Sequence, residues 1–120
     1  MSDRALICLG ANASDAELQI AAAFDFLSQR GEVLRTSGVY PSDPEYSCDA
    51  ATYLNCIVEL STPLDYSAMQ SAVKDYEREV RAHGEPGFVA VDIDIVMWND
   101  TLLRPADASS RYFAKGMQLM

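Results

Sequence analysis

Apolar and polar residues alternate, or apolar residues form short β-branched runs, in four separate segments of the chain. These segments are residues 5–9, 33–40, 53–60 and 90–98. Successive side chains of a strand point to opposite faces, so such a segment has one face for a core and one face for solvent. The apolar side of 53–60 consists of Leu54, Cys56, Val58 and Leu60. The pattern therefore predicts four strands.

Two segments between these strands repeat apolar residues every three or four positions, which is the spacing of one helix face. The first follows Ser14 and Glu17, whose spacing is that of a capping box, and it ends at Gly31. The second runs from about residue 65 to 83 and is closed by a glycine. Its apolar side consists of Tyr66, Met69, Val73, Tyr76 and Val80. After Arg104 we expect only a loop and at most one further strand.

The predicted elements follow one another in the order β-α-β-β-α-β. That order is the split βαβ, or ferredoxin-like, arrangement of the α+β class, in which an antiparallel sheet carries its helices on one face. A length of 120 residues fits one domain over residues 1–120 with a single core. The apolar strand positions should meet the helices. The polar positions should then lie together on the opposite, more open face.

The chain carries a net charge of -9. Nucleic acids and anionic membrane surfaces bind cationic protein faces, so this charge argues against both as general partners. A polyanionic small molecule remains a possible ligand if cations or a few local arginines neutralise it, and the chain itself should be a monomer or a weak homodimer. Its cysteines, Cys8, Cys48 and Cys56, are odd in number, and the sequence shows neither a signal-peptide pattern nor a long apolar segment. We therefore expect a cytoplasmic protein without disulfides.

Two carboxylates interrupt the last predicted strand. Asp92 and Asp94 are two residues apart, so they share one face of that strand. Like charges at this spacing repel unless solvent or a cation screens them. A magnesium ion is one such cation, since it takes one or two carboxylates and leaves its other positions to water and to substrate phosphates. An exposed strand with polar residues outward explains the same pattern, and the residues alone leave both interpretations open.

Short motifs along nearly the whole chain resemble those of one enzyme family. They are Leu9-Gly10-Ala11-Asn12, Val39-Tyr40 with Pro44, Tyr53-Leu54-Asn55, Glu77 and Arg81, Gly87, Val91-Asp92-Ile93-Asp94-Ile95, and Arg111 with Phe113. Each motif is weak alone, but the aspartate pair after a helix and a glycine loop is fairly specific in combination. The chain thus resembles the 6-hydroxymethyl-7,8-dihydropterin pyrophosphokinases of folate biosynthesis. That family has a ferredoxin-like fold, which agrees with the predicted order of elements.

The resemblance implies an enzyme that binds ATP with two magnesium ions, transfers pyrophosphate to the hydroxymethyl group of the pterin and releases AMP. Asp92 and Asp94 would be catalytic as ligands of the two ions, and Arg81 would be catalytic through its contact with phosphate. Charge accumulates on the oxygens around the attacked phosphorus, so positioned cations supply most of the catalysis. The sequence indicates no general base.

The same resemblance implies which residues contact the two substrates. Asn55 would recognise the amide edge of the pterin, because its carboxamide offers both a donor and an acceptor. Tyr53 and Phe113 would flank the flat ring, and Pro44 would line the same site. An ordinary strand residue explains Tyr53 equally well.

Glu77, Arg81 and Arg111 would contact the ATP cofactor by the same resemblance. A guanidinium group suits phosphate oxygens because it is a planar group with several donors. An ion pair between Glu77 and Arg81 on one helix face also explains these two residues, and it is worth only ~0.3–0.5 kcal/mol.

The chain departs from the family where cationic residues are usual. Glu79, Val89 and Ala106 occupy three such positions. Each of them removes a partner for the triphosphate. A non-catalytic relative that binds a pterin, a nucleotide or a protein is therefore one alternative to the enzyme. A ferredoxin-like regulatory or interaction module, which pairs through an exposed sheet edge, is another.

Overall fold

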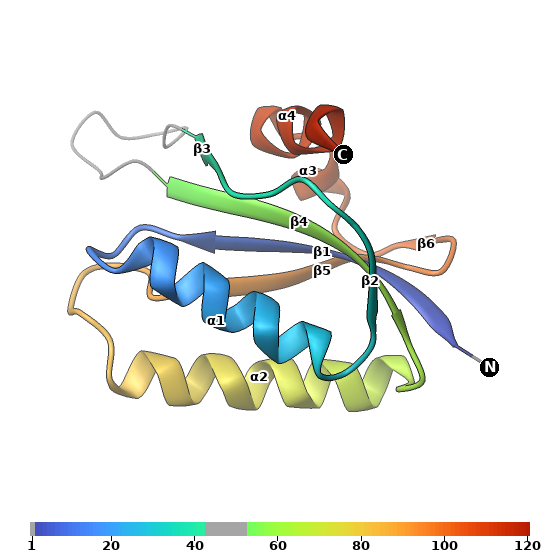
Figure 1. Cartoon of the computed structure of the whole chain (residues 1–120), viewed down its shortest axis with the longest axis horizontal. Helices are drawn as coiled ribbons and strands as arrows, with labels where there is room; N and C mark the ends of the chain where they lie inside the picture. The colour runs from blue at the N-terminus through green and yellow to red at the C-terminus, as the bar shows by residue number, and fades with distance from the viewer. Residues whose placement is uncertain (1, 43–52) are drawn as a thin grey trace.

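The computed structural model describes residues 2–42 and 53–120, which form one sheet with helices on both sides (Figure 1). The strands are β1 (Asp3–Ala11), β2 (Glu32–Thr36), β3 (Tyr40–Ser42), β4 (Tyr53–Thr62), β5 (Asp92–Trp98) and β6 (Thr101–Leu102). The helices are α1 (Ala16–Ser28), α2 (Tyr66–Ala82), α3 (Pro105–Ala108) and α4 (Arg111–Leu119). The predicted α+β, ferredoxin-like class is confirmed, because β1, α1, β2, β4, α2 and β5 follow in the expected order.

All pairs of neighbouring strands in the sheet are antiparallel, and the strand order is β2-β4-β1-β5-β6, with β3 also paired to β4. Strand β1 lies in the middle, between β4 and β5. Because both neighbours run against β1, its C-terminal end lies beside the beginnings of β4 and β5. The predicted site residues of the strands come from these two beginnings, so the topology brings them to one end of the sheet. They are Tyr53, Asn55, Asp92 and Asp94.

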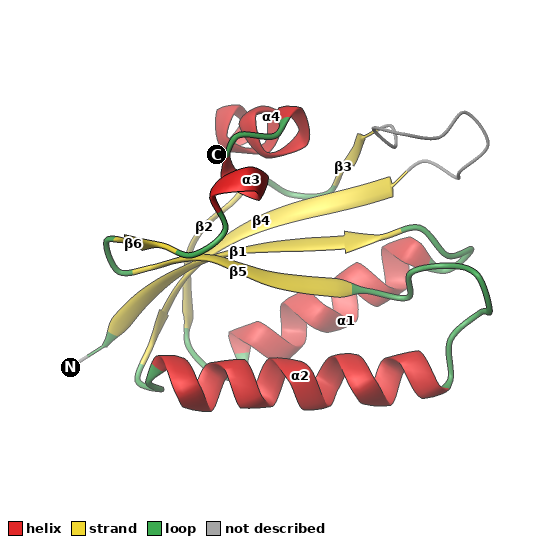
Figure 2. Cartoon of the chain, turned by 180° about the vertical axis from the view of Figure 1, so that it is seen from behind, coloured by secondary structure: helices red, strands yellow, loops and turns green. Residues whose placement is uncertain are grey.

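Helices α1 and α2 cover one face of the sheet and enclose the main core (Figures 1 and 2). The strands contribute Ile7, Leu9, Val58, Leu60, Ile93 and Ile95 to this core. Helix α2 begins where the sequence predicts, because Asp65 is its N-cap and accepts a hydrogen bond from the Ala68 N–H at 2.8 Å. The inward side of α2 includes Met69 and Val73, which are almost completely buried.

The start of helix α1 differs from its prediction. Asp15 is the N-cap residue, and no side chain caps this end of the helix. Ser14 is engaged elsewhere, because its hydroxyl and its backbone N–H both donate to Glu85 Oε2, at 2.9 and 3.2 Å. The predicted capping box between Ser14 and Glu17 is therefore wrong. Ser14 instead binds the loop that precedes β5.

One predicted strand is divided in two. The pattern predicts a single strand over residues 33–40, whereas the structure has β2 and β3 with a short break between them. Gly38 lies in the break with φ of 71°, a left-handed conformation that glycine adopts without strain. Ser37 holds the break against the sheet, since its hydroxyl accepts a hydrogen bond from the Ile57 N–H at 2.8 Å. The chain then brings Tyr40 to a buried position.

The residues after Arg104 form α3 and α4, so the expectation of a loop and at most one strand is wrong. These helices lie on the face opposite α1 and α2 (Figure 2). The prediction that the helices lie on one face of the sheet is therefore correct for α1 and α2, but α3 and α4 lie on the other face. A second core lies under α4 and consists of Leu6, Cys8, Tyr40, Ile57, Val96 and Phe113. Gly116 permits the close approach of α4, because a Cβ there would overlap the Tyr40 hydroxyl.

Cys8 and Cys56 are buried free thiols, and Cys48 lies outside the described residues. Burial, together with the negative charge of Asp94, raises the pKa of Cys8 to about 12, so this thiol stays neutral. Across residues 2–42 and 53–120, every helix is too short or too polar to cross a membrane.

Candidate functional site

The two aspartates of β5 lie on the same face of the sheet as α3 and α4. Asp92 is the first residue of β5 and is exposed, and Asp94 follows on the same side with intermediate burial. Ile93 and Ile95 point the other way into the main core. The prediction that the two carboxylates share one face is confirmed.

Strand pairing places Asn55 and Asp92 on either side of Gly10. Gly10 is the partner of Asn55 in β4 and of Asp92 in β5. Neighbouring strands lie about 4.8 Å apart, so the backbones of Asn55 and Asp92 are about 10 Å apart with only a glycine between them. Because glycine has no side chain, the sheet surface is low at this row. We call this row, with an amide at one side and a carboxylate at the other, the seat over Gly10.

The side chain of Asn55 is held in place at the edge of this seat. Asn55 is only 5% exposed, and its Nδ2 donates to the Ser42 hydroxyl at 2.5 Å. Its Oδ1 lies 3.5 Å from the position that a Cβ on Gly10 would take. A buried amide with a fixed orientation presents its polar atoms in one arrangement, which is a requirement for recognising a particular ring edge.

Tyr53 comes from the same strand as Asn55 and lies near the carboxylates. Burial raises the pKa of Tyr53 above its ordinary value, and the negative charge of Asp92 raises it further. The phenol therefore stays neutral at physiological pH. Tyr53, Asn55 and Asp92 are thus brought together on one face, as the sequence predicts.

Both aspartates of β5 have a raised pKa. For Asp92 the main cause is partial desolvation by the surrounding protein atoms, followed by the negative charge of Glu77, while Arg81 and Arg104 lower the pKa in part. For Asp94 the main cause is again desolvation; Arg104 opposes it and the charge of Asp92 adds to it. Desolvation therefore makes the ionised form of both carboxylates less favourable than it is in water. A cation bound between the carboxylates would offset this penalty.

Arg104 belongs to the site although sequence reasoning missed it. Its Nη1 lies 3.7 Å from Asp94 Oδ1, and its Nε donates to Asp107. The contact with Asp94 depends on the chain reversal after β5, which no local pattern reveals.

Glu77 and Arg81 lie on α2 and line a hollow of about 460 Å³ together with Asp92 and the loop 84–91. Glu77 is 8% exposed, and its Oε2 accepts a hydrogen bond from the Ile93 N–H at 2.8 Å. The Lys74 Nζ lies 4.0 Å from Glu77 Oε1. The described contacts of Glu77 are therefore with β5 and Lys74 rather than with Arg81. Arg81 is exposed at the last turn of α2. Its side chain is thus accessible beside Asp92.

The C-terminal helix α4 carries two further predicted residues. Phe113 is 7% exposed and packs in the second core, so its ring fixes α4 to the sheet. Arg111 is the first residue of α4 and is exposed. Pro44, which the resemblance places in the substrate site, lies outside the described residues.

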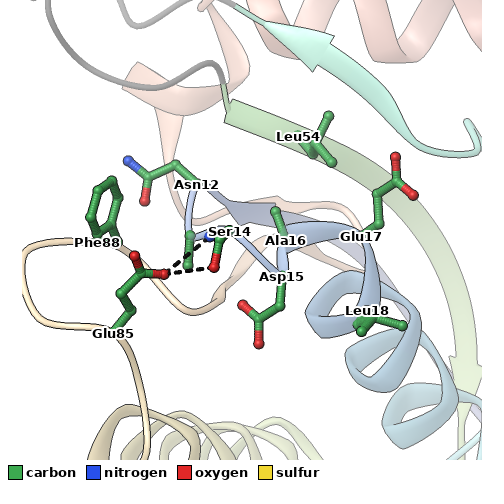
Figure 3. A pocket seen from close by; sticks show the side chains of 10 residues that line it. Asn12, Ser14, Asp15, Ala16, Glu17, Leu18, Leu54, Glu85 and Phe88 are labelled. Atoms are coloured by element: carbon green, nitrogen blue, oxygen red, sulfur yellow. Dashed lines mark hydrogen bonds between the residues drawn. The ribbon is translucent and has the colours of Figure 1, made fainter.

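A second hollow lies at the same end of the sheet, between the start of α1 and the loop 84–90 (Figure 3). Glu85 reaches across it to Ser14, and the exposed ring of Phe88 stands at its edge. Asn12 ties the same two segments together, since its N–H donates to the Val89 carbonyl at 3.0 Å and its Oδ1 accepts from the Val89 N–H at 2.6 Å. These bonds position the loop that leads into Asp92.

The donor set fits a magnesium ion that is held partly by substrate. In the part of the chain that the structure describes, no group of three or more acidic, histidine or cysteine side chains gathers around a metal position. Asp92 and Asp94 together offer two carboxylates on an accessible face. Magnesium is commonly bound by one or two carboxylates plus water and phosphate oxygens, so a site of this kind is completed by water and by a ligand that carries phosphate.

The fold and this face define a ferredoxin-like α+β protein with a paired-carboxylate site on its sheet. The sequence model of the 7,8-dihydro-6-hydroxymethylpterin-pyrophosphokinase (HPPK) family matches residues 6–117, and the chain therefore belongs to that family. It is also 32% identical, over 103 residues, to the 2-amino-4-hydroxy-6-hydroxymethyldihydropteridine pyrophosphokinase of Bacillus subtilis (strain 168). That match covers 82% of this chain and 62% of the relative. The family resemblance predicted from the motifs is confirmed.

Proposed function

We propose that the chain transfers pyrophosphate from ATP to the hydroxymethyl group of 6-hydroxymethyl-7,8-dihydropterin and releases AMP, as a step of folate biosynthesis. The observation that carries the proposal is the row formed by Asn55, Gly10 and Asp92, with Asp94 on the same face. Family membership and the printed name of the relative support it. The small soluble substrates fit a cytoplasmic monomer or weak homodimer.

In this proposal the seat over Gly10 takes the pterin. The carboxamide of Asn55 meets the amide edge of the ring, because its orientation is already fixed by Ser42. Tyr53, at the start of the same strand, offers an aromatic face to the ring. The hydroxymethyl group then points along the row towards the carboxylates of β5.

Asp92 and Asp94 would hold the two magnesium ions implied by the family. When bound, such ions screen the charge that develops on the phosphate oxygens. The chain itself supplies the two carboxylates on a rigid strand, and it holds them at one spacing because Ile93 and Ile95 are anchored in the core. Positioning of this kind accounts for much of the catalysis of phosphoryl-type transfer.

The nucleotide would lie over the hollow between α2 and the loop 84–91. Arg81 lines this hollow and is exposed, so its guanidinium can meet phosphate oxygens. Glu77 lines it too, and its bond to the Ile93 N–H also fixes the strand that carries both aspartates. Arg111 would contact the nucleotide from α4. Phe113, which the resemblance places beside the pterin ring, is buried in the second core.

AMP release in the presence of ATP, magnesium and the pterin tests the proposal. Asp92→Ala and Asp94→Ala should each lower the rate by about 10³-fold or more, since each removes a ligand of the ions that stabilise the transferring group. Asp100→Ala is the matched control, because Asp100 is an exposed aspartate in the turn after β5. AMP release that does not require the pterin, or that survives both substitutions, would contradict the proposal.

A second candidate is a relative that binds the pterin or a nucleotide without turnover. Three positions favour it, because Glu79, Val89 and Ala106 carry no positive charge where the family usually has a cationic residue. Pterin binding can be followed by the intrinsic fluorescence of the ring, with Asn55→Ala as the variant that should weaken it. Binding that depends on Asn55, with no AMP formed at any magnesium concentration, would favour this candidate over the enzyme.

A further inference from the structure

The guanidinium group of Arg104 occupies the position of a counter-ion beside the paired aspartates. Its Nη1 is 3.7 Å from Asp94 Oδ1, and its side chain is 49% exposed. Among the described salt bridges, this one supplies the direct cationic contact to the pair; Lys74, which also lowers the pKa of Asp94, acts at longer range. The protein therefore places one of its own cations next to a carboxylate proposed to hold magnesium.

Backbone and side-chain bonds hold Arg104 in this place. Its N–H donates to the Val96 carbonyl at 3.4 Å, and Val96 follows Asp94 by two residues on the same strand face. On the other side, Asp107 accepts from Arg104 Nε and also from the Tyr112 hydroxyl, the latter at 3.3 Å. The guanidinium is thus held between α3 and β5 without being buried. It can leave Asp94 while it keeps Asp107.

We infer that Arg104 pairs with Asp94 in the ligand-free site and gives up this carboxylate when a divalent cation binds. Its guanidinium then contacts the phosphates that the cation brings. The inference rests on the proposed function. A cation and a guanidinium both bind carboxylate oxygens, so occupation by one weakens the other. The released guanidinium lies beside the new phosphate oxygens, and it supplies a positive charge in a site where Glu79, Val89 and Ala106 supply none.

Binding of Mn²⁺ alone, measured by water-proton relaxation, tests the exchange without any turnover. Arg104→Gln should tighten Mn²⁺ binding by about two- to five-fold, which is the value of an exposed ion pair expressed as a ratio of binding constants. In an Asp94→Asn background the same substitution should have a clearly smaller effect, since the contact is already gone and only the longer-range charge of Arg104 on Asp92 remains. A structural role for Arg104 would instead weaken Mn²⁺ binding in both backgrounds.

Lys74→Gln is the matched control for charge acting at a distance. Lys74 also lowers the pKa of Asp92 and Asp94, but its Nζ contacts Glu77 rather than either aspartate. We expect Lys74→Gln to change Mn²⁺ binding by less than Arg104→Gln, and equally in the presence and absence of Asp94. Equal effects of the two substitutions, or an effect of Arg104→Gln that is as large in Asp94→Asn as in the unsubstituted chain, would overturn the inference.

The second readout is the affinity for magnesium-bound ATP. Arg104→Gln should weaken it by about ten-fold, because a hydrogen bond from a charged donor is lost, while Mn²⁺ alone binds more tightly. Weaker binding of both, or unchanged ATP binding, would overturn the inference. The proposed function is tested separately by AMP release. If the unsubstituted chain shows no pterin-dependent AMP release, the proposed function fails, whatever the Mn²⁺ measurements show.

Discussion

Replacing Asp92 with asparagine should stabilise the ligand-free protein while it weakens metal binding. Asp92 shares one strand face with Asp94, and the negative charge of Glu77 also acts on it. Asparagine keeps the shape of the side chain and removes its charge. The substitution therefore removes the cost of holding an ionised carboxylate at this position when no cation is bound.

The size of the gain follows from the geometry of β5. Residues two apart in a strand are separated by about 6.7 Å. Two unit charges at that distance repel by about 0.6 kcal/mol in water and by about 1.2 kcal/mol at an effective dielectric of 40. Arg104 offsets part of the charge of Asp94, so we expect a gain of about 0.5–1 kcal/mol, which corresponds to a rise in Tm of about 2–5 °C for a domain of this length.

The gain should depend on pH in a defined direction. Burial and Glu77 raise the pKa of Asp92 in the folded chain above its ordinary value of 3.8. The folded state therefore holds the proton to higher pH than the unfolded state, and the free energy of unfolding falls as the pH rises from the unfolded pKa through the folded one. The penalty is complete at neutral pH and absent below the unfolded pKa. Asp92→Asn should thus lose its advantage towards pH 3.

Urea-induced unfolding in the presence of a chelator measures this effect, at neutral pH and at about pH 3.5. Asp100→Asn is the control, since it removes the same charge from an exposed turn. Asp92→Asn should exceed this control at neutral pH and match it in acid. Destabilisation by Asp92→Asn, or a gain equal to that of Asp100→Asn at neutral pH, would refute the reasoning.

Three further substitutions test the surroundings of the site. Gly116→Ala should lower the free energy of unfolding by about 1–3 kcal/mol, because the added methyl overpacks the contact of α4 with the sheet; unchanged urea unfolding would contradict this. Glu77→Ala should cost a similar amount, about 1–3 kcal/mol, since it leaves the buried Ile93 N–H without its acceptor, and Glu77→Gln should recover most of it. Gly10→Ala adds a methyl at 3.5 Å from Asn55 Oδ1, an ordinary contact, so unfolding should be unchanged while pterin fluorescence titrations show weaker binding. Unchanged pterin affinity would contradict the seat over Gly10.

Periodicity was sufficient for the elements that bury one clear face. Strand β4 and helix α2 follow the predicted segments closely, because their apolar residues repeat every two or every three to four positions and meet the main core. The shared face of Asp92 and Asp94 follows from the same alternation. The part of the site that lies along single strands was therefore predictable.

The C-terminal helices were not predicted, although a weak signal exists. Ser110 caps α4 by accepting a hydrogen bond from the Phe113 N–H at 3.3 Å, and Phe113 and Gly116 share its inner side. Glycine is a poor helix former, so this side looks irregular in the sequence. Only the close approach of α4 to Tyr40 explains why a glycine stands there.

Other features depend on contacts between distant segments. Ser14 and Glu17 have the spacing of a capping box, but Glu85, far along the chain, binds Ser14 instead. Arg104 reaches Asp94 only because the chain turns back after β5. Local patterns do not encode such partners, since each partner is chosen by the fold as a whole.

The most direct test of the candidate site is the NMR line broadening that Mn²⁺ causes when bound with an ATP analogue and the pterin. We predict the strongest loss of amide signals around Asp92 and Asp94, and next at Gly10 and Asn55, which lie in the same rows of the sheet. Broadening centred on the second hollow instead, around Ser14 and Glu85, would contradict the assignment of the site.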